Sequence, residues 1–267
     1  MSNTTSFTGS VPENYERYLG PWIFEPFAME LAGRVELETV RDVLEIACGS
    51  GRVTSKLRRA LPPDVRLVAT DISSDMLDIA KNLLRGNDIS WLQADAQALP
   101  FTDSCFDVLV CQFGLMFVPD KAKALSEAYR VLRPNGRILF GTWDILEKNP
   151  ALFMADQLLQ EFFPVDPPSF LRVPFSMGDE KELARLFEAA GFREISIELI
   201  DKECRSPSAA DAVTGMLEGS PVALTIQARN PSSLPQIRTA LEARLAEKFG
   251  DSPLICPMQA RFVMAGK

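Results

Sequence analysis

The chain has 267 residues, a formal net charge of −8 at pH 7 and no histidine. An acidic chain is poorly suited to nucleic acid, because recognition of a polyanion relies on clustered Lys and Arg, so we expect a small-molecule partner instead. The missing histidine excludes Ser-His-Asp and Cys-His nucleophilic catalysis and histidine-bound zinc, and we expect no metal site.

Neither a targeting segment nor a membrane span is expected. The N-terminus lacks a basic stretch followed by an apolar run, and no apolar run in the sequence is long enough to cross a bilayer. The five cysteines are scattered and form no C-x-x-C pair, which is typical of reduced, buried thiols. We therefore expect a cytoplasmic protein.

Residues 1–37 are expected to form N-terminal lid helices. Pro12 can open a short helix, Gly20-Pro21 is expected to break it, and apolar residues at helical spacing predict a second helix from Trp22 to Val35. This apolar face most simply packs on a sheet. Three aromatic residues near the predicted break are candidates to close over a ligand: Tyr15, Tyr18 and Trp22.

Strands alternate with helices between residues 38 and 145. Apolar runs typical of buried strands end at Ile46, Asp71, Asp95, Cys111 and Trp143. The intervening segments have helical spacing and are bounded by capping residues and Pro or Gly stops. Strands and helices in this order predict right-handed βαβ units and an α/β doubly wound sheet.

The rest of the chain is expected to complete the sheet and to cap it. Residues 146–178, with a helix at 150–163 and a proline-rich stretch after it, are predicted to be a substrate-cap insertion. Residues 179–267 supply the strands 194–200 and 259–265, with a helical insertion at about 207–250. This insertion could complete the cap or form a homodimer contact. We expect one domain, 1–267.

The first strand runs directly into the turn Glu45-x-Ala47-x-Gly49-x-Gly51, and a helix begins near Arg52. Backbone N–H groups and the dipole at such a helix N-terminus favour the polar end of a nucleotide-like ligand. Asp71 ends the second strand, 20 residues after Gly51, where a carboxylate can accept hydrogen bonds from ribose hydroxyls. Asp95 ends the third strand, where it can face an adenine edge.

As an ordered set, these segments resemble the class I S-adenosylmethionine-dependent methyltransferases, in the group of the ubiquinone/menaquinone biosynthesis methyltransferases. The resemblance is carried by residues 43–51, 69–73, 93–101, 106–110 and 132–137. It implies a Rossmann-like seven-stranded sheet of order 3-2-1-4-5-7-6 with the last strand antiparallel and with helical lid insertions. It also implies S-adenosylmethionine as cofactor and S-adenosylhomocysteine as product.

The resemblance also implies a cofactor site at matching positions. It places Glu45, Ala47, Gly49 and Gly51 beside the methionine part of the cofactor, Asp71 on the ribose, Ile72 and Met76 on the adenine, Asp95 and Ala96 at the adenine's polar edge, and Gln112 and Gly114 at the methyl-donor end. Arg52 is expected to reach the cofactor carboxylate, and Tyr15 to line the same site. The aromatic candidates for the acceptor wall are Tyr18, Trp22, Phe113 and Trp143. At Ala47 the chain departs from the family, which most often has glycine there.

The expected reaction is methyl transfer to a small, hydrophobic or planar acceptor, by in-line displacement that depends mainly on positioning. No residue is identified as a general base. Two alternatives remain open. A nicotinamide-dependent oxidoreductase would share the glycine turn and the acid at Asp71, although Thr54 stands where its third glycine is expected. A regulatory protein would bind the cofactor without turnover.

Overall fold

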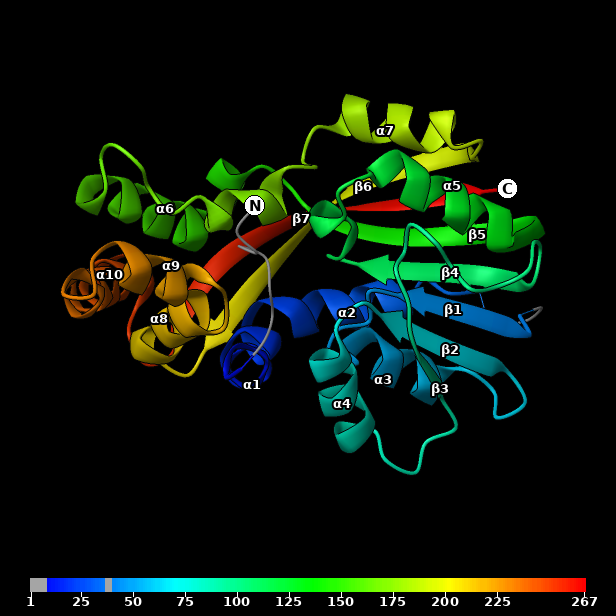
Figure 1. The fold of residues 1–267 in the computed structure, drawn as a ribbon, viewed down its shortest axis with the longest axis horizontal. Coiled ribbons are helices and arrows are strands. Elements are labelled where there is room, and N and C mark those ends of the chain that lie inside the picture. Colours follow the sequence, from blue (N-terminus) through cyan, green and yellow to red (C-terminus); the bar gives the residue numbers. More distant parts are fainter. Residues whose placement is uncertain (1–8, 37–39) are drawn as a thin grey trace. The chain divides into compact units, whose positions relative to one another are not determined.

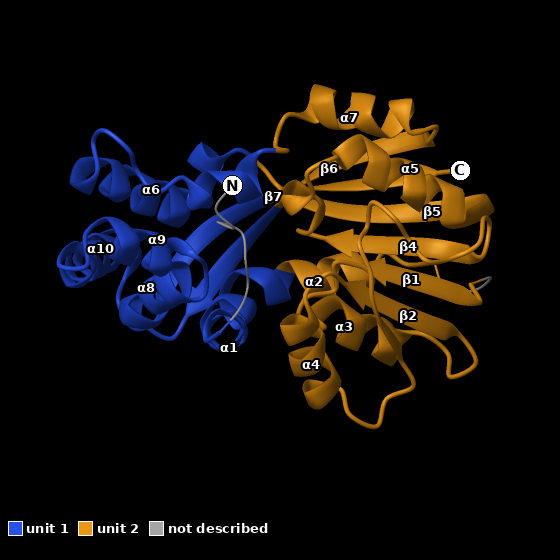
Figure 2. Ribbon diagram, in the orientation of Figure 1, with its two compact units in different colours: residues 1–26, 145–176, 201–259 blue, residues 27–144, 177–200, 260–267 orange. Residues whose placement is uncertain are grey.

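The computed structural model describes residues 9–36 and 40–267. Residues 1–8, which open the predicted lid segment 1–37, and residues 37–39 lie outside the described part. The chain divides into two compact units (Figure 2). The helical unit comprises Met1–Pro26, Ile145–Ser176 and Asp201–Gln259, and the sheet unit comprises Phe27–Asp144, Met177–Ile200 and Ala260–Lys267. The prediction of one domain with insertions stays a prediction.

The seven strands form one sheet of order β3-β2-β1-β4-β5-β7-β6, as predicted (Figure 1). The strands are β1 (Asp42–Ile46), β2 (Arg66–Asp71), β3 (Ser90–Gln93), β4 (Phe106–Gln112), β5 (Leu132–Trp143), β6 (Arg193–Ser206) and β7 (Leu254–Gly266). Strands β3, β2, β1, β4 and β5 pair in parallel, and β7 is antiparallel to β5. The carboxyl ends of the parallel strands therefore lie at one edge of the sheet unit.

Helices precede or follow most strands of the sheet unit, as the capping pattern predicts. They are α2 (Glu25–Ala32), which begins in the helical unit, α3 (Arg52–Ala60), α4 (Ser74–Leu83), α5 (Lys121–Val131) and α7 (Glu180–Ala189), with the short 3₁₀ turn η2 (Leu115–Phe117). The side chains of Ser73, Asp120 and Asp179 each accept a backbone N–H in the first turn of the helix that follows. Consecutive residues of β1 and β4 are buried, so both faces of the sheet are covered there.

The helical unit is built from short helices. They are α1 (Val11–Asn14), the π-helix η1 (Tyr15–Phe24), the 3₁₀ turns η3 (Leu146–Lys148) and η4 (Phe170–Phe175), α6 (Pro150–Phe162), α8 (Ala209–Glu218), α9 (Val222–Arg229) and α10 (Ser233–Phe249). Helix α9 is an element that the sequence pattern did not predict. In α8, a Cβ on Gly215 would lie 3.1 Å from the Cβ of Tyr18, so α8 packs closely on η1.

The predicted break at Gly20-Pro21 is wrong, because helical backbone continues through it. Proline has no N–H to donate, but the wider π-helical turn lets the N–H of Glu25 bond the carbonyl of Gly20, five residues back. This geometry tolerates the proline that an α-helix would exclude from its interior.

Strands β6 and β7 are longer than predicted. Both continue beyond the sheet unit, over residues 201–206 and 254–259, into the helical unit. In β7, buried residues still alternate through this extension, at Leu254, Cys256 and Met258, but Pro257 interrupts the sequence signal for a strand. No helix in the described ranges 9–36 and 40–267 is long and apolar enough to span a membrane.

An ion-pair network ties β1, β4 and β5 together at the edge opposite the strand carboxyl ends. The guanidinium of Arg133 donates to Asp107 at 2.6 Å and to Asp42 at 2.7 Å. The backbone N–H groups of Arg41 and Asp42 donate to the second oxygen of Asp107 at 2.8 and 2.9 Å. Burial alone would raise the pKa of Asp107, but these donors together lower it. Ionised Asp107 therefore stabilises the fold.

We expect Asp107→Asn to lower the free energy of unfolding by about 1–3 kcal/mol at neutral pH, because two backbone donors and a guanidinium lose a charged acceptor. The pKa of Asp107 is lowered on folding. The stabilisation that ionised Asp107 provides is therefore present above the pKa it has in the unfolded chain, and it is lost as the pH falls through the pKa it has in the folded protein. The difference between variant and wild type should therefore shrink in acid, as measured by urea unfolding. Asp64→Asn is the control, since its pair with Arg41 is exposed; an equal loss there would contradict this account.

Candidate active site

The loop between β1 and α3 is a left-handed turn. Ala47, Gly49 and Gly51 have φ angles of 52°, 55° and 85°. The N–H of Cys48 donates to the carbonyl of Thr70 at 2.9 Å, which ties the loop to the end of β2. Gly51 is required for space as well as for its φ, because a Cβ there would lie 3.0 Å from Leu84.

The carboxylate of Asp71 holds two loops at once. One oxygen accepts the N–H of Gly49 at 2.8 Å, and the other accepts the N–H of Ser73 at 2.9 Å. Burial raises the pKa of Asp71, while the N–H groups of Ser73, Gly49 and Ile72 oppose that rise. Each carboxylate oxygen has a second lone pair, so Asp71 can brace the glycine loop and still accept hydroxyl groups of a ligand.

Three buried polar atoms around the loop have no hydrogen-bond partner within the described part of the chain: Glu45 Oε2, Ser50 Oγ and Thr54 Oγ1. Their residues are 2%, 4% and 0% exposed. Buried polar groups without partners are costly, and each calls for a physical explanation. Ser50 and Thr54 were not predicted as site residues; Ser50 lies in the loop just before α3, and Thr54 lies in the first turn of α3.

The interior behind the loop is acidic. Burial raises the pKa of Glu45 to about 8; the nearby hydroxyl and backbone N–H of Thr54 favour the ionised form and oppose the rise, and the charge of Asp71 adds to it. Burial, together with the charges of Glu45 and Asp71, also raises the pKa of the Cys48 thiol. The pKa of the Cys111 thiol is raised to about 12, again first by burial. A cationic group brought here would be favoured by both carboxyls.

The predicted adenine side lies on β2, α4 and the loop after β3. Ile72 is 66% exposed directly after Asp71, whereas Met76 is buried with its Cε beside Gly49. Asp95 accepts the backbone N–H of Gln97 at 2.8 Å and also its side-chain amide, so it shapes its own loop. Ala96 is half-buried next to it.

The predicted methyl-donor end follows β4. Phe113 has a φ of 54°, its N–H donates to Gly141 at 2.8 Å, and its ring stacks on Trp143 with centroids 3.8 Å apart. Phe113 and Trp143 are 5% and 2% exposed, so in this structure they pack on each other. Gln112 and Gly114, on either side of Phe113 in the chain, are half-buried. The role of the two aromatic rings as an acceptor wall stays a prediction.

The remaining predicted residues have separate surroundings. Arg52 is half-buried in the first turn of α3. Tyr15, Tyr18 and Trp22 lie on η1 of the helical unit, where Tyr15 packs on Phe24 with centroids 4.9 Å apart and Trp22 is 1% exposed. The predicted closure of these three aromatic residues over a ligand stays a prediction, as does the contact of Arg52 with the cofactor carboxylate.

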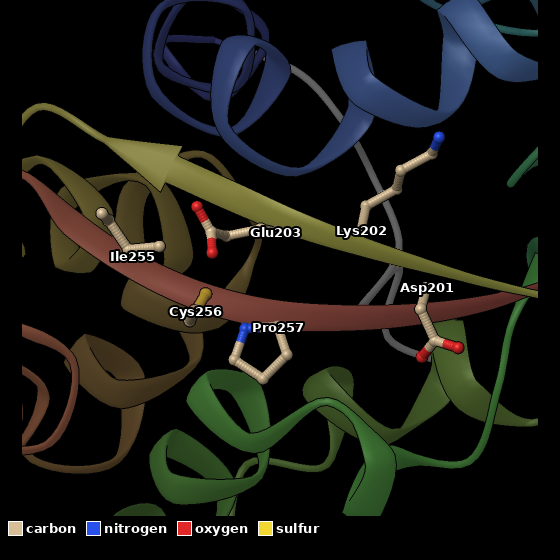
Figure 3. Close-up of a pocket in the computed structure, with 6 residues that line it drawn as sticks. All are labelled: Asp201, Lys202, Glu203, Ile255, Cys256 and Pro257. Atoms are coloured by element: carbon tan, nitrogen blue, oxygen red, sulfur yellow. The ribbon is translucent and has the colours of Figure 1, made fainter.

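A separate hollow of about 250 Å³ lies in the helical unit, along the extensions of β6 and β7 (Figure 3). Its lining residues are Asp201, Lys202, Glu203, Ile255, Cys256 and Pro257. None of the residues that the sequence predicts for the site is among them. The candidate site therefore rests on the carboxyl ends of the parallel strands, not on this hollow.

Comparison with known proteins identifies the family of the chain. A family model described as "Methyltransferase domain" matches residues 44–140. The fold of the YcgJ protein from Bacillus subtilis is similar, with a TM-score of 0.59 at 17% identity, covering 91% of this chain and 98% of that one.

Two curated relatives share the name ubiquinone/menaquinone biosynthesis C-methyltransferase UbiE. The relative from Hahella chejuensis is 46% identical over 101 residues, or 36% of this chain and 41% of the relative. The relative from Proteus mirabilis is 33% identical over 168 residues, or 58% of this chain and 67% of the relative. The chain belongs to the class I S-adenosylmethionine-dependent methyltransferases. It spans about half the length of the first curated relatives that it matches.

The residues of the candidate site fit the family's cofactor. A nucleoside needs a hydroxyl acceptor and an apolar surface, and these are available at Asp71 and at the exposed side chain of Ile72. The amino-acid end carries charged polar groups, and the partnerless atoms of Glu45, Ser50 and Thr54 offer it hydrogen bonds. In the described residues, no group of three His, Cys, Asp or Glu side chains is arranged to hold a metal ion.

Replacing Asp71 by Ala should weaken binding of S-adenosylhomocysteine by about 1–3 kcal/mol, because charge-assisted hydrogen bonds to the ribose are lost. Calorimetry measures this change. Asp75→Ala, an exposed residue in the first turn of α4, serves as the control and should bind normally. Unchanged affinity in folded Asp71→Ala would remove Asp71 from the site.

The protein should also lose stability as the pH rises, because of Glu45. Its pKa rises from 4.5 to about 8 on folding, so the folded protein keeps a proton that the unfolded chain releases between these values. Relative to Glu45→Gln, we expect the wild-type free energy of unfolding to fall across this range, by at most about 1.4 kcal/mol per pH unit. Denaturant unfolding at a series of pH values measures the slope.

The matched control for this titration is Glu188→Gln, since Glu188 is exposed on α7. Its unfolding free energy should follow that of the wild type at every pH. Parallel curves for wild type and Glu45→Gln would show that Glu45 ionises normally in the folded protein.

Proposed function

We propose that this chain transfers the methyl group of S-adenosylmethionine to a small, hydrophobic or planar acceptor. The observation that carries the proposal is the brace formed by Asp71 and the glycine loop, together with the three partnerless polar atoms beside it. A nicotinamide-dependent oxidoreductase would also use an acid at this strand end, but the family match does not favour that alternative.

The residues of the site supply binding and orientation. When bound, S-adenosylmethionine would supply an electrophilic sulfonium methyl: the acceptor's nucleophilic atom would bond to the methyl carbon in line as the C–S bond breaks, and sulfur would keep that electron pair. Asp71 would fix the ribose, and Ile72 and Met76 would pack on the adenine. With the methyl and the nucleophile held in line, positioning alone can contribute about 7–11 kcal/mol to lowering the barrier.

The buried carboxyl of Glu45 suits a cationic cofactor. Without a ligand, its pKa of about 8 leaves it mainly protonated at neutral pH. An ammonium or sulfonium group nearby would stabilise the ionised form and release the proton. With no histidine in the chain, any proton that the acceptor loses goes to water, a carboxylate, a tyrosine or a lysine.

The apolar segment of residues 146–178 supports a hydrophobic acceptor. Phe153, Phe162 and Phe163 are half-buried there, whereas Phe170 and Phe175 are buried and belong to the core of the helical unit. The names of the curated relatives indicate C-methylation in quinone biosynthesis. An electron-rich aromatic carbon is therefore the first acceptor type to test.

Two measurements test the proposal. Calorimetry with S-adenosylhomocysteine and, separately, with NAD should show binding of the first and none of the second. Incubation with labelled S-adenosylmethionine and a panel of phenols, amines and quinols should then give a labelled product. No binding of S-adenosylhomocysteine at millimolar concentration would reject the proposal, and binding without product across the panel would favour a regulatory protein.

A further inference from the structure

The loops after β1 and β4 approach each other more closely than an ordinary side chain would permit. These strands are neighbours, and their parallel register runs from Val43 opposite Val108 to Glu45 opposite Val110. Just beyond the paired residues, a Cβ added to Gly114 would overlap the Cβ of Ala47 and would lie 3.7 Å from its Cα. Two carbon atoms normally rest about 3.5–4.0 Å apart, so the Ala47 methyl fills the space of a side chain at position 114.

Glycine at position 114 is needed for space and not for backbone conformation. Its φ of −104° and ψ of −41° are accessible to any residue. Ala47 is the strained member of the pair, since its φ of 52° is left-handed. Gly114 thus leaves free the space that the Ala47 methyl occupies.

The loop around Gly114 cannot easily move away from Ala47. On one side, the N–H of Phe113 donates to Gly141 at 2.8 Å, and the Phe113 ring stacks on Trp143. On the other side, the carbonyl of Gly114 accepts the N–H of Phe117 at 3.1 Å. A larger residue at position 114 would therefore push on the loop after β1, which carries Gly49 and Gly51.

We infer that Ala47 and Gly114 form a reciprocal steric pair that fixes the spacing between the two loops and thereby positions the methionine half of the cofactor. The positioning role rests on the proposed function, whereas the steric pair does not. Gly114 is in this sense a positioning residue: it acts through Ala47 and the loop backbone. The pair makes a definite prediction about which substitutions rescue each other.

The test is a double-mutant cycle of Gly114→Ala, Ala47→Gly and both together. Gly114→Ala should lower the melting temperature and weaken S-adenosylhomocysteine binding at least about tenfold, and the double variant, which also removes the Ala47 methyl, should recover most of both losses. Ala47→Gly supplies the reference value that closes the cycle. Adenosine, which lacks the methionine half, should lose less affinity than S-adenosylhomocysteine in Gly114→Ala. A general loss of structure would instead weaken the binding of adenosine and of S-adenosylhomocysteine by the same factor.

Gly266→Ala is the matched control, because a Cβ there meets nothing closer than 3.8 Å. It should melt and bind like the wild type. If Gly114→Ala does not fold, folding of the double variant supports the pair. A double variant as impaired as Gly114→Ala, or a Gly114→Ala variant that behaves like the wild type, overturns the pair. A wild type that does not bind S-adenosylhomocysteine rejects the proposed function and the positioning role, while the melting temperatures still decide the pair.

Discussion

The arrangement of the candidate site depends on one carboxylate with two backbone donors. Asp71 accepts the N–H of Gly49 from the loop after β1 and the N–H of Ser73 at the start of α4. The two loops are thus held at a fixed separation before any ligand arrives. Pre-organisation of this kind lowers the entropic cost of binding. The same backbone N–H donors oppose the rise in the pKa of Asp71 that burial causes. They explain how this strand end can hold a buried acid.

The chemistry of the site follows from its surroundings. Glu45 and Asp71 are buried near one another, so a cation that enters this interior would favour the ionised form of both carboxyls. With no histidine in the chain, proton transfer has few side chains available. Such a site is better suited to holding a reactive cation in one orientation than to acid–base catalysis, and methyl transfer from a sulfonium needs that orientation most.

Most of the sheet could be predicted from the sequence, because alternating apolar strands and capped helices report local preferences directly. The helical unit is harder to predict from the sequence. The π-helix through Gly20-Pro21 depends on a five-residue hydrogen bond that sequence rules do not anticipate, and the extension of β7 past Pro257 depends on its partner strands. In the site, Asp71 and the glycine turn could be predicted by position. Ser50, Thr54 and the fit of Ala47 against Gly114 depend on tertiary contacts.

A crystal structure of the chain with S-adenosylhomocysteine would test the central claim most directly. The account predicts the ribose hydroxyls within about 3 Å of the Asp71 carboxylate, with the Asp71 bonds to Gly49 and Ser73 intact. It also predicts that the methionine half lies along the loop that carries Ala47. Ligand bound elsewhere on the chain, or ribose hydroxyls that do not contact Asp71, would contradict it.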